Sequence, residues 1–490
     1  MRYLMFLMAC ALTAMCAWAA QVENVAGQLA SQLPDHSITS LSVTGTMDAR
    51  DFKFMRDSLP ELATVDLSGV VILAYDNVQA PVFESVQSYA AASIPCTSFM
   101  GKKLTAITLP SSLKSIGFGA FAGCRQLKAV SVPETVDSIA SYAFNGTGLT
   151  AITLPERVRV LGEGVFSRCH ALVAASIPNA VIGNFTFLGD TLLSKVTLGS
   201  GVMRIGAGAF NGCTSLTSVE FSHESLVSSI GNEAFILSGI KNLDLSQWTR
   251  LEQVGDWAFA TTPVRQVNLP GSVTKMGEGA FFCDTALASL SLPAHASEVS
   301  AFALAGCTRL AIDSILPEGC ASVGDYAFYN CSQHADFVIP GTVSFIGTQA
   351  MAGMTGLQTV KALPATVPAL GDSVWAGVSQ PLVKLDIPDE QVARAYAAAE
   401  QWKEFHILRT VLLGDVDMDG SVDVADVTTL VNEILGNHPA SFDGLAADLD
   451  DNSVYDSADV TSLINIILHK GAGGYVRKAP SACQGSVPSK

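Results

Sequence analysis

The sequence is poor in basic residues, and these residues form no stripe along the chain. It has 28 Lys and Arg against 45 Asp and Glu, which gives a formal net charge of −17 at pH 7. Because phosphate repels an acidic chain, this balance argues against a nucleic-acid partner. Residues 411–470 hold eleven aspartates, Glu433 and only Lys470, so most of the negative charge lies near the C-terminus. Such a segment requires cations as counterions.

Long apolar runs are missing after the first twenty residues. No later stretch approaches the ~18 apolar residues that a membrane-spanning helix needs, so we predict no transmembrane span. Residues 1–20 have the layout of a secretory signal peptide, with Arg2, an apolar run and a small-residue end at Ala17–Ala20. We therefore expect a secreted or cell-surface protein. Lipoprotein anchoring at Cys16 is the alternative, although the residues before it make a poor lipobox.

Catalytic motifs are also missing. The sequence has no Gly-x-Ser-x-Gly elbow, no His-Glu-x-x-His pattern and no phosphate-binding loop. Its eight histidines share no ligand or triad spacing. Paired carboxylates for glycoside cleavage stay open, because folding can bring them together from any part of a chain. We predict no catalytic residues and no enzymatic cofactor, and interpret the protein as noncatalytic.

One pattern returns about every 23 residues between residues 96 and 382. It reads Leu-x-x-Ile-x-Leu-Pro, a polar turn and Val-x-x-Ile-Gly-x-x-Ala-Phe-x-Gly-Cys, and residues 104–124 are the clearest copy. The alternation in Leu-x-x-Ile-x-Leu predicts one short strand per copy. A lone strand has no core, so the copies must stack about 4.8 Å apart as an α/β repeat solenoid. One apolar position would then form an internal ladder through Phe121, Phe144, Phe166, Phe187, Phe210, Phe235, Phe259, Phe281, Leu304, Phe328 and Met351.

Glycine and cysteine also recur in this pattern. The Ile-Gly step, as at Gly117 and Gly206, predicts the tight backbone turn that each coil needs. Three residues after the ladder position stand Cys124, Cys169, Cys213, Cys307 and Cys331. We interpret them as buried and reduced, because unpaired cysteine behaves as a small hydrophobe. Cys96, Cys320 and Cys483 lie outside this register, and Cys320 with a ladder neighbour is the candidate for any disulfide.

The pattern resembles the BspA-like leucine-rich repeats of bacterial surface and secreted proteins, with Ala-Phe-x-Gly-Cys as its strongest mark. The ends of a solenoid need covers, because open ends expose strand edges. We assign residues 21–95 to an N-terminal cap with strand, helix and strand between residues 38 and 67. Residues 96–382 are the repeats. We assign residues 383–410 to a C-terminal cap, with a last strand at Leu385 and a helix over residues 389–405 that Asp389 caps.

Two twelve-residue runs near the C-terminus have the spacing of calcium loops. Residues 415–426 and 448–459 place oxygen side chains at positions 1, 3, 5, 9 and 12, and the same apolar helix pattern follows each run. In the first loop we assign the side chains of Asp415, Asp417 and Asp419, the Ser421 carbonyl, Asp423 through water, and Asp426 as the bidentate closing ligand. The second loop offers Asp448, Asp450, Asn452, the Val454 carbonyl, Asp456 and Asp459.

We expect two calcium sites of unequal strength. Position 6 is Gly420 in the first loop and Ser453 in the second, and a non-glycine residue at this sharp bend strains the backbone. Asn452 is also neutral where Asp419 is charged, so the second site should be weaker. A solvated acidic tail is the alternative, but such a tail has no reason to repeat ligand spacing and helix phase together.

The duplicated loop and helix over residues 411–470 resembles a type I dockerin domain. The resemblance implies a cohesin-like partner that is bound in the presence of calcium. It also implies partner contacts at loop positions 10 and 11, which are Val424, Ala425, Ser457 and Ala458 here, in place of the Ser-Thr pair common in cellulosomal relatives. Residues 471–490 are rich in Gly, Pro and Ser, which predicts a flexible tail.

Three functions fit these observations. The first is a noncatalytic secreted or cell-surface binding or adhesion protein, in which the solenoid recognises an unknown protein or glycan while the dockerin attaches it to a partner. The second is a component of a polysaccharide-degrading complex, either a glycan-binding accessory or a cryptic glycoside hydrolase. In the third, the calcium module only folds the C-terminus and spaces the repeats from the cell. No recurring surface signature identifies the solenoid's ligand.

Overall fold

The structure is a computed structural model of the whole chain. It describes residues 19–76, 88–221, 224–311, 316–387, 390–408, 410–439, 441–450, 452, 454–468 and 476–478. The chain divides into two compact units. One consists of Met1–His334, Phe345–Gly356 and Leu370–Val378, and the other of Ala335–Ser344, Leu357–Ala369 and Ser379–Lys490. Across the described residues, every helix is too short or too polar to span a bilayer.

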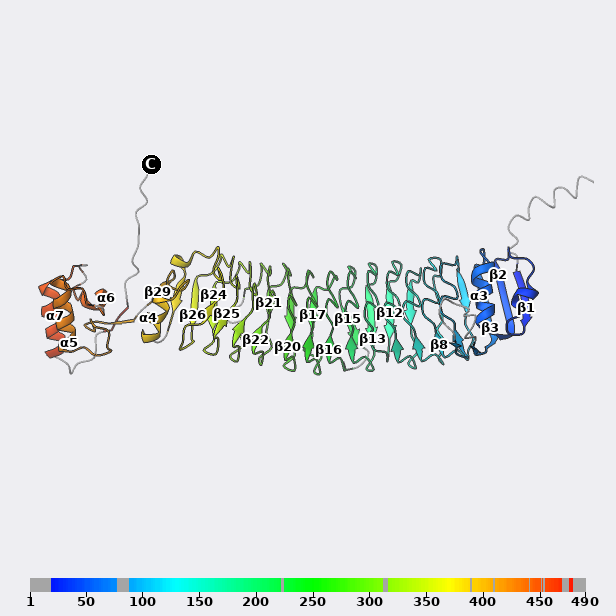
Figure 1. Cartoon of the computed structure of the whole chain (residues 1–490), viewed down its shortest axis with the longest axis horizontal. Coiled ribbons are helices and arrows are strands. Elements are labelled where there is room, and N and C mark those ends of the chain that lie inside the picture. Colours follow the sequence, from blue (N-terminus) through cyan, green and yellow to red (C-terminus); the bar gives the residue numbers. More distant parts are fainter. Residues whose placement is uncertain are drawn as a thin grey trace, which may run out of the picture. The chain divides into compact units, whose positions relative to one another are not determined.

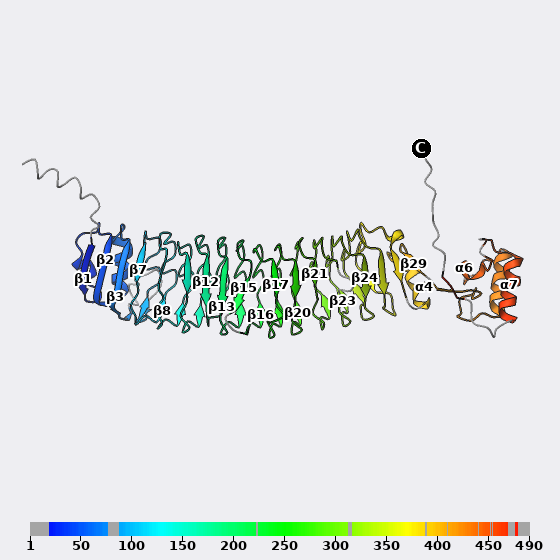
Figure 2. The same cartoon turned by 180° about the vertical axis from the view of Figure 1, so that it is seen from behind.

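The first unit is a stack of coils that follow one another in chain order (Figures 1 and 2). Most Leu-x-x-Ile-x-Leu segments supply a short parallel strand, as the alternation predicts, although the copy at residues 127–132 has none. Register is kept from coil to coil, since Ile152 lies opposite Ala175 and Ala175 opposite Val196. These strands are β7 (Ala106–Thr108), β10 (Ala151–Thr153), β12 (Ala174–Ile177), β13 (Lys195–Leu198), β15 (Val219–Phe221), β17 (Asn242–Asp244), β19 (Gln266–Asn268) and β21 (Ser289–Leu290).

A second line of parallel strands forms at the Ile-Gly step, where the sequence predicts only a turn. Each of these strands is two residues long, too short to produce a detectable period. They are β6 (Ser93–Ile94), β8 (Ser115–Ile116), β9 (Ser138–Ile139), β11 (Val160–Leu161), β14 (Arg204–Ile205), β16 (Ser229–Ile230), β18 (Gln253–Val254), β20 (Lys275–Met276), β22 (Glu298–Val299), β23 (Ser322–Val323), β25 (Phe345–Ile346) and β27 (Ala369–Leu370). Each coil therefore has two strand positions.

The glycine of the Ile-Gly step is required by close approach between coils. Gly206 has no positive φ, so the tight turn predicted at this step does not depend on the left-handed conformation that glycine allows. A Cβ added there would lie 2.5 Å from the backbone carbonyl carbon of Gly183, one coil earlier. The left-handed conformation occurs instead at the glycine of Ala-Phe-x-Gly, as at Gly123 with φ 74°.

The predicted phenylalanine ladder is confirmed as the core of the coils. Rings stack continuously from Phe99 to Phe281, with centroids 5.1–5.6 Å apart and interplanar angles of 4–14°. Buried Leu304, Phe328 and Met351 occupy the following ladder positions. The ladder begins one coil earlier than predicted, at Phe99. These aromatic contacts and the buried area stabilise neighbouring coils against one another.

The repeated thiols form a second buried column. Cys124 donates a hydrogen bond to the Phe99 carbonyl of the preceding coil at 3.0 Å, and the other ladder thiols donate in the same way at 3.1–3.2 Å. Burial raises the pKa of Cys124 to about 12, which keeps the thiol protonated. The described cysteines form no disulfide, so the Cys320 candidate is not borne out, and its thiol donates to the Ser322 carbonyl. Cys483 lies outside the described residues.

The N-terminal cap has the predicted succession of strand, helix and strand. Its elements are β1 (Ala19–Asn24), α2 (Leu29–Gln32), β2 (Ser40–Met47), α3 (Ala49–Ser58), β3 (Thr64–Ile72), β4 (Tyr75–Asp76) and β5 (Ser88–Tyr89). Asp48 caps α3 in a reciprocal capping box with Asp51. Phe52 of α3 meets Phe99 edge-on at 6.1 Å, so the helix closes the end of the ladder.

The second unit contains the last parallel strands and the C-terminal cap. Its sheet consists of β24 (Asp336–Ile339), β26 (Thr359–Ala362), β28 (Lys384–Asp386) and β29 (His406–Leu408), and η1 (Gln380–Leu382) precedes β28. The helix predicted for residues 389–405 is shorter, since α4 spans Glu390–Ala398. Gln401 then adopts a left-handed conformation, and the buried Trp402 packs edge-on against Tyr396 at 5.0 Å. Strand β29 therefore replaces Leu385 as the last strand position, and Asp389 lies outside the described residues.

The rest of the second unit is a small helical module. It has β30 (Thr410–Leu412), α5 (Val424–Ile434), α6 (Gly444–Ala447), α7 (Ser457–Leu468) and β31 (Val476–Lys478). Helices α5 and α7 share a core of Val416, Val422, Leu430, Ala447 and Leu463. Strand β31 pairs antiparallel with β30 and lies within residues 471–490, the predicted flexible tail. The other residues of that segment lie outside the described residues.

Candidate metal centre

The first acidic loop leads directly into helix α5, and the same carboxylates organise both. Asp423 is the N-cap of α5 and accepts a hydrogen bond from the Ala425 amide at 2.8 Å. Asp426 completes a capping box by accepting from the Asp423 amide at 2.7 Å. Its other oxygen accepts from the amides of Val416 and Asp417 at 2.6 and 3.0 Å. Asp426 thus ties the start of the loop to the start of the helix.

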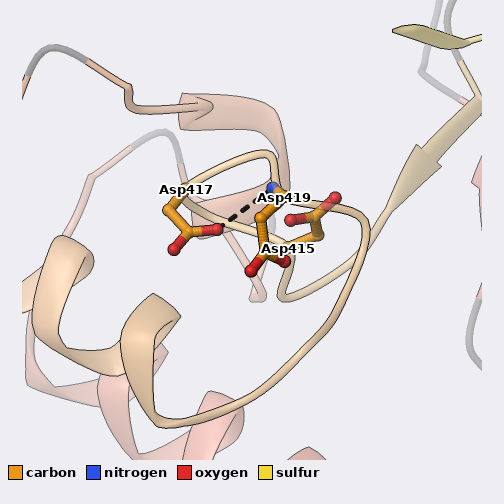
Figure 3. Close-up of side chains that lie close together, drawn as sticks. All are labelled: Asp415, Asp417 and Asp419. Carbon is orange, nitrogen blue, oxygen red and sulfur yellow. Dashed lines mark hydrogen bonds between the residues drawn. The ribbon is translucent and has the colours of Figure 1, made fainter.

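Three aspartates of this loop converge on one point. Carboxylate oxygens of Asp415, Asp417 and Asp419 lie within 4.8 Å of one another, and Figure 3 shows the side chains gathered inside the bend of the loop. Local hydrogen bonds shape the bend, because Asp417 accepts from the Asp419 amide at 3.1 Å and Asp415 from the Gly420 amide at 3.2 Å. Gly420 has φ 86°, the left-handed bend predicted at position 6.

The second loop repeats this arrangement with a different third member. Asp448, Asp450 and Asp459 have carboxylate oxygens within 4.8 Å of one another. Asp459 accepts from the amides of Leu449 and Asp456 at 2.7 and 3.0 Å, as Asp426 does in the first loop. Asn452 donates to Asp450 at 2.9 Å and accepts from the Val454 amide at 2.7 Å. Ser453, the predicted strained position, lies outside the described residues.

The electrostatics of the first loop favour a cation. Burial raises the pKa of Asp415, and its acidic neighbours Asp417 and Asp419 also oppose its ionisation. Burial likewise raises the pKa of Asp417. Hard oxygen donors gathered at this separation are the ligands that calcium prefers. The residues present therefore fit a calcium ion, which would neutralise this mutual repulsion. Asp426 lies outside the cluster of three, whereas its counterpart Asp459 lies within the second cluster.

The other predicted ligands and partner residues lie around these clusters. Ser421 and Asp423 are exposed in the first loop, as is Val454 in the second, while Asp456 is half-buried. The four predicted partner residues, Val424, Ala425, Ser457 and Ala458, are exposed at the first turns of α5 and α7. A partner could therefore reach both helix starts.

One residue beside the first loop has no signal in the sequence. Arg394 of helix α4 donates a hydrogen bond to the Met418 carbonyl, and its Nη2 lies 3.8 Å from Oδ2 of Asp415. Arg394 belongs to the predicted cap and Asp415 to the predicted calcium loop. No periodicity or spacing relates the two segments, so only the folded structure shows the contact.

Comparison with protein families gives a match for the repeats and another for the C-terminal module. Residues 92–187, 180–311 and 279–399 match the family described as "BspA type Leucine rich repeat region", in six copies. Residues 413–468 match the family described as "Dockerin type I domain". A comparison with curated proteins found no match.

Solved structures of bacterial leucine-rich repeat proteins are similar to this chain. A leucine-rich repeat protein from Bacteroides ovatus is 21% identical, with a TM-score of 0.57 over 76% of this chain and 88% of that one. A leucine-rich repeat protein from Eubacterium ventriosum is 18% identical, with a TM-score of 0.41 over 69% of this chain and 90% of that one. The first likeness supports the repeat solenoid, and at this identity it speaks for the fold alone.

Proposed function

The chain belongs to the BspA-type leucine-rich repeat family and carries a type I dockerin domain, and on this premise we propose that it is a secreted or cell-surface protein that attaches to a cohesin-bearing partner in a calcium-dependent manner. Repeats and dockerins are noncatalytic binding and docking domains, typical of extracellular or cell-surface bacterial proteins. In the proposed arrangement the solenoid recognises a macromolecule, and the dockerin joins it to an assembly. The observation that carries the proposal is the convergence of aspartates in both loops at ligand spacing.

The docking proposal is tested with the full chain against a panel of bacterial cohesin modules. We expect one class of cohesin to bind in calcium and to dissociate in chelator, as measured by surface plasmon resonance. Replacing Asp415 and Asp448 by Ala should abolish binding, because each acidic cluster then loses a carboxylate. Exchanging the exposed Val424 for Asp should weaken the cohesin complex while calcium binding persists. Equal binding in calcium and chelator, or binding to no cohesin class, would refute calcium-dependent docking.

Two calcium ions of unequal affinity are proposed for the dockerin. Each loop brings three carboxylates together, but the first loop keeps Asp426 as a fourth, whereas Asn452 of the second loop is neutral where Asp419 is acidic. We expect isothermal titration to resolve two sites, with Asp450→Ala removing the weaker one and Asp417→Ala the tighter one. Two equal sites, or a tighter second site, would contradict this order.

Glycan binding by the solenoid is a second candidate, supported by the surface of the first unit. Aromatic side chains from successive coils lie half-buried there, and the rings of Phe302 and Tyr326 stack at 4.8 Å. A surface hollow of 280 Å³ lies in the neighbouring coils and is lined by Glu278, Glu298 and Ser300, among others. Aromatic faces and carboxylates are groups that hold sugar rings and hydroxyls. Glycan-array binding that Phe302→Ala removes would favour this candidate, and a blank array would dismiss it.

A further inference from the structure

The contact between the C-terminal cap and the first acidic loop joins a cation to a predicted calcium ligand. Arg394 projects from α4, and its side chain is 25% exposed, while the side chain of Asp415 is only 3% exposed. A guanidinium that approaches a nearly buried carboxylate interacts with it in a medium less polar than water. Water and salt therefore screen this contact less than they screen an ion pair on the open surface.

Arg394 contacts two groups of the first loop, and a bound calcium ion would affect them differently. Met418 contributes its carbonyl to Arg394, and that carbonyl is not among the assigned ligands of the loop. Asp415 is the predicted ligand at position 1 of the loop. The Oδ2 atom of its carboxylate also lies 3.8 Å from Nη2 of Arg394. A dication held by Asp415 repels the guanidinium, and the guanidinium in turn lowers the affinity of Asp415 for the dication.

We propose that Arg394 is an intramolecular competitor of calcium at the first dockerin loop, and that calcium binding releases this loop from the cap helix. The inference rests on the calcium binding proposed above. It adds a regulatory contact, because a loop held on α4 and a loop loaded with calcium become alternative states. If calcium weakens the contact of Arg394 with the loop, this contact must weaken calcium binding by the same factor, because coupling free energies are reciprocal.

Calcium titration of the full chain tests the competition. Arg394→Gln removes the charge and leaves a shorter polar side chain. We expect this variant to bind calcium at the first loop about tenfold more tightly than the original chain, from the strength of a charge pair about 4 Å apart in a partly solvated site. Arg394→Lys keeps the charge and should stay close to the original affinity. Asp450→Ala in all chains weakens the second loop, so that the titration reports the first.

A charge-matched control separates this contact from general electrostatics. Lys403→Gln removes one positive charge from an exposed position of the same cap. It should change the first-loop affinity little. An equal gain in the Lys403 and Arg394 variants, or no gain in Arg394→Gln, would overturn the proposal.

A second experiment measures the release of the loop from the cap helix independently of the calcium affinity. Hydrogen exchange of the full chain, followed by mass spectrometry over residues 390–398, should become faster when calcium is added. The same segment in Arg394→Gln should exchange at one fast rate in calcium and in chelator. Calcium-independent exchange in the original chain would overturn the release. If the original chain binds no calcium, the proposed calcium sites are overturned as well. If it binds calcium and Arg394→Gln leaves the affinity unchanged, only the role of Arg394 is overturned.

Discussion

At the scale of single residues, two buried carboxyl groups interrupt the thiol column of the solenoid. Asp190 and Asp284 stand three residues after Phe187 and Phe281, the position that cysteine occupies in other coils. Both side chains are fully buried. One oxygen of Asp190 accepts from the Cys169 amide at 2.7 Å, and the other has no hydrogen-bond partner within the described part of the chain. Burial raises the pKa of Asp190 to about 9.

This residue should make the stability of the solenoid depend on pH. An ordinary aspartate ionises near pH 4, so between about pH 4 and 9 the unfolded chain loses a proton that the folded chain keeps. The free energy of unfolding then falls as pH rises through this window, by up to about 1.4 kcal/mol per pH unit. Asp190→Asn keeps the acceptor for Cys169 and cannot ionise. We expect this variant to match the original chain near pH 4 and to be increasingly more stable toward pH 9, as measured by chemical denaturation.

The exposed Asp372 provides the control for Asp190. Asp372→Asn should change stability little at either pH, because this side chain stays in contact with water. A constant difference between Asp190→Asn and the original chain from pH 4 to 9 would contradict a protonated carboxyl in the core. The position of Asp190 could be found from the sequence by aligning the repeats on their phenylalanines. Its protonation could not, because that depends on how completely neighbouring coils exclude water.

At the scale of elements, the spacing between coils depends on glycine more than on turn geometry. Periodicity predicts the Leu-x-x-Ile-x-Leu strands, because polar and apolar residues alternate around the Ile position. It misses the two-residue strands such as β14 and β16, whose pairing places Ile205 opposite Ile230. Their existence follows from the stacking of neighbouring coils, which a local pattern does not contain. The close approach at Gly206 belongs to this same line of strands.

Gly206→Ala should therefore destabilise the solenoid, although alanine is a common residue elsewhere in the repeat. The new Cβ would lie 2.5 Å from the backbone of Gly183, and backbone cannot rotate away as a side chain can. We expect a loss of about 2 kcal/mol or more in the free energy of unfolding, measured by denaturant titration. Gly271→Ala is the matched control, because an added Cβ there has nothing within 4 Å. It should be neutral or stabilising by up to about 1 kcal/mol. Equal effects of the two substitutions would refute the close-approach argument.

At the scale of the whole molecule, the sequence predicts the repeated long segments and loops, and it misses the two-residue strands and the contacts that occur only once. The solenoid and both acidic loops recur within the chain, so each copy supports the interpretation of the next. The pairing of β30 with β31 and the contact of Arg394 with Asp415 each happen once, between segments without a shared pattern. The end of α4 at Ala398 is of the same kind, since it depends on the burial of Trp402 under the cap.

The two modules should also differ in their dependence on calcium. Among the described residues, the dockerin core has five buried members, Val416, Val422, Leu430, Ala447 and Leu463, whereas the solenoid has a continuous stack of rings. A small core gains proportionally more from a bound ion, and calcium at 100 times its dissociation constant adds about 2.7 kcal/mol per site. In scanning calorimetry of the full chain, calcium should raise the dockerin transition and leave the main solenoid transition in place. The Asp415→Ala and Asp448→Ala double variant should lose that shift. A calcium-induced rise of the solenoid transition, or a dockerin transition unchanged by chelator, would contradict calcium sites confined to the two acidic loops.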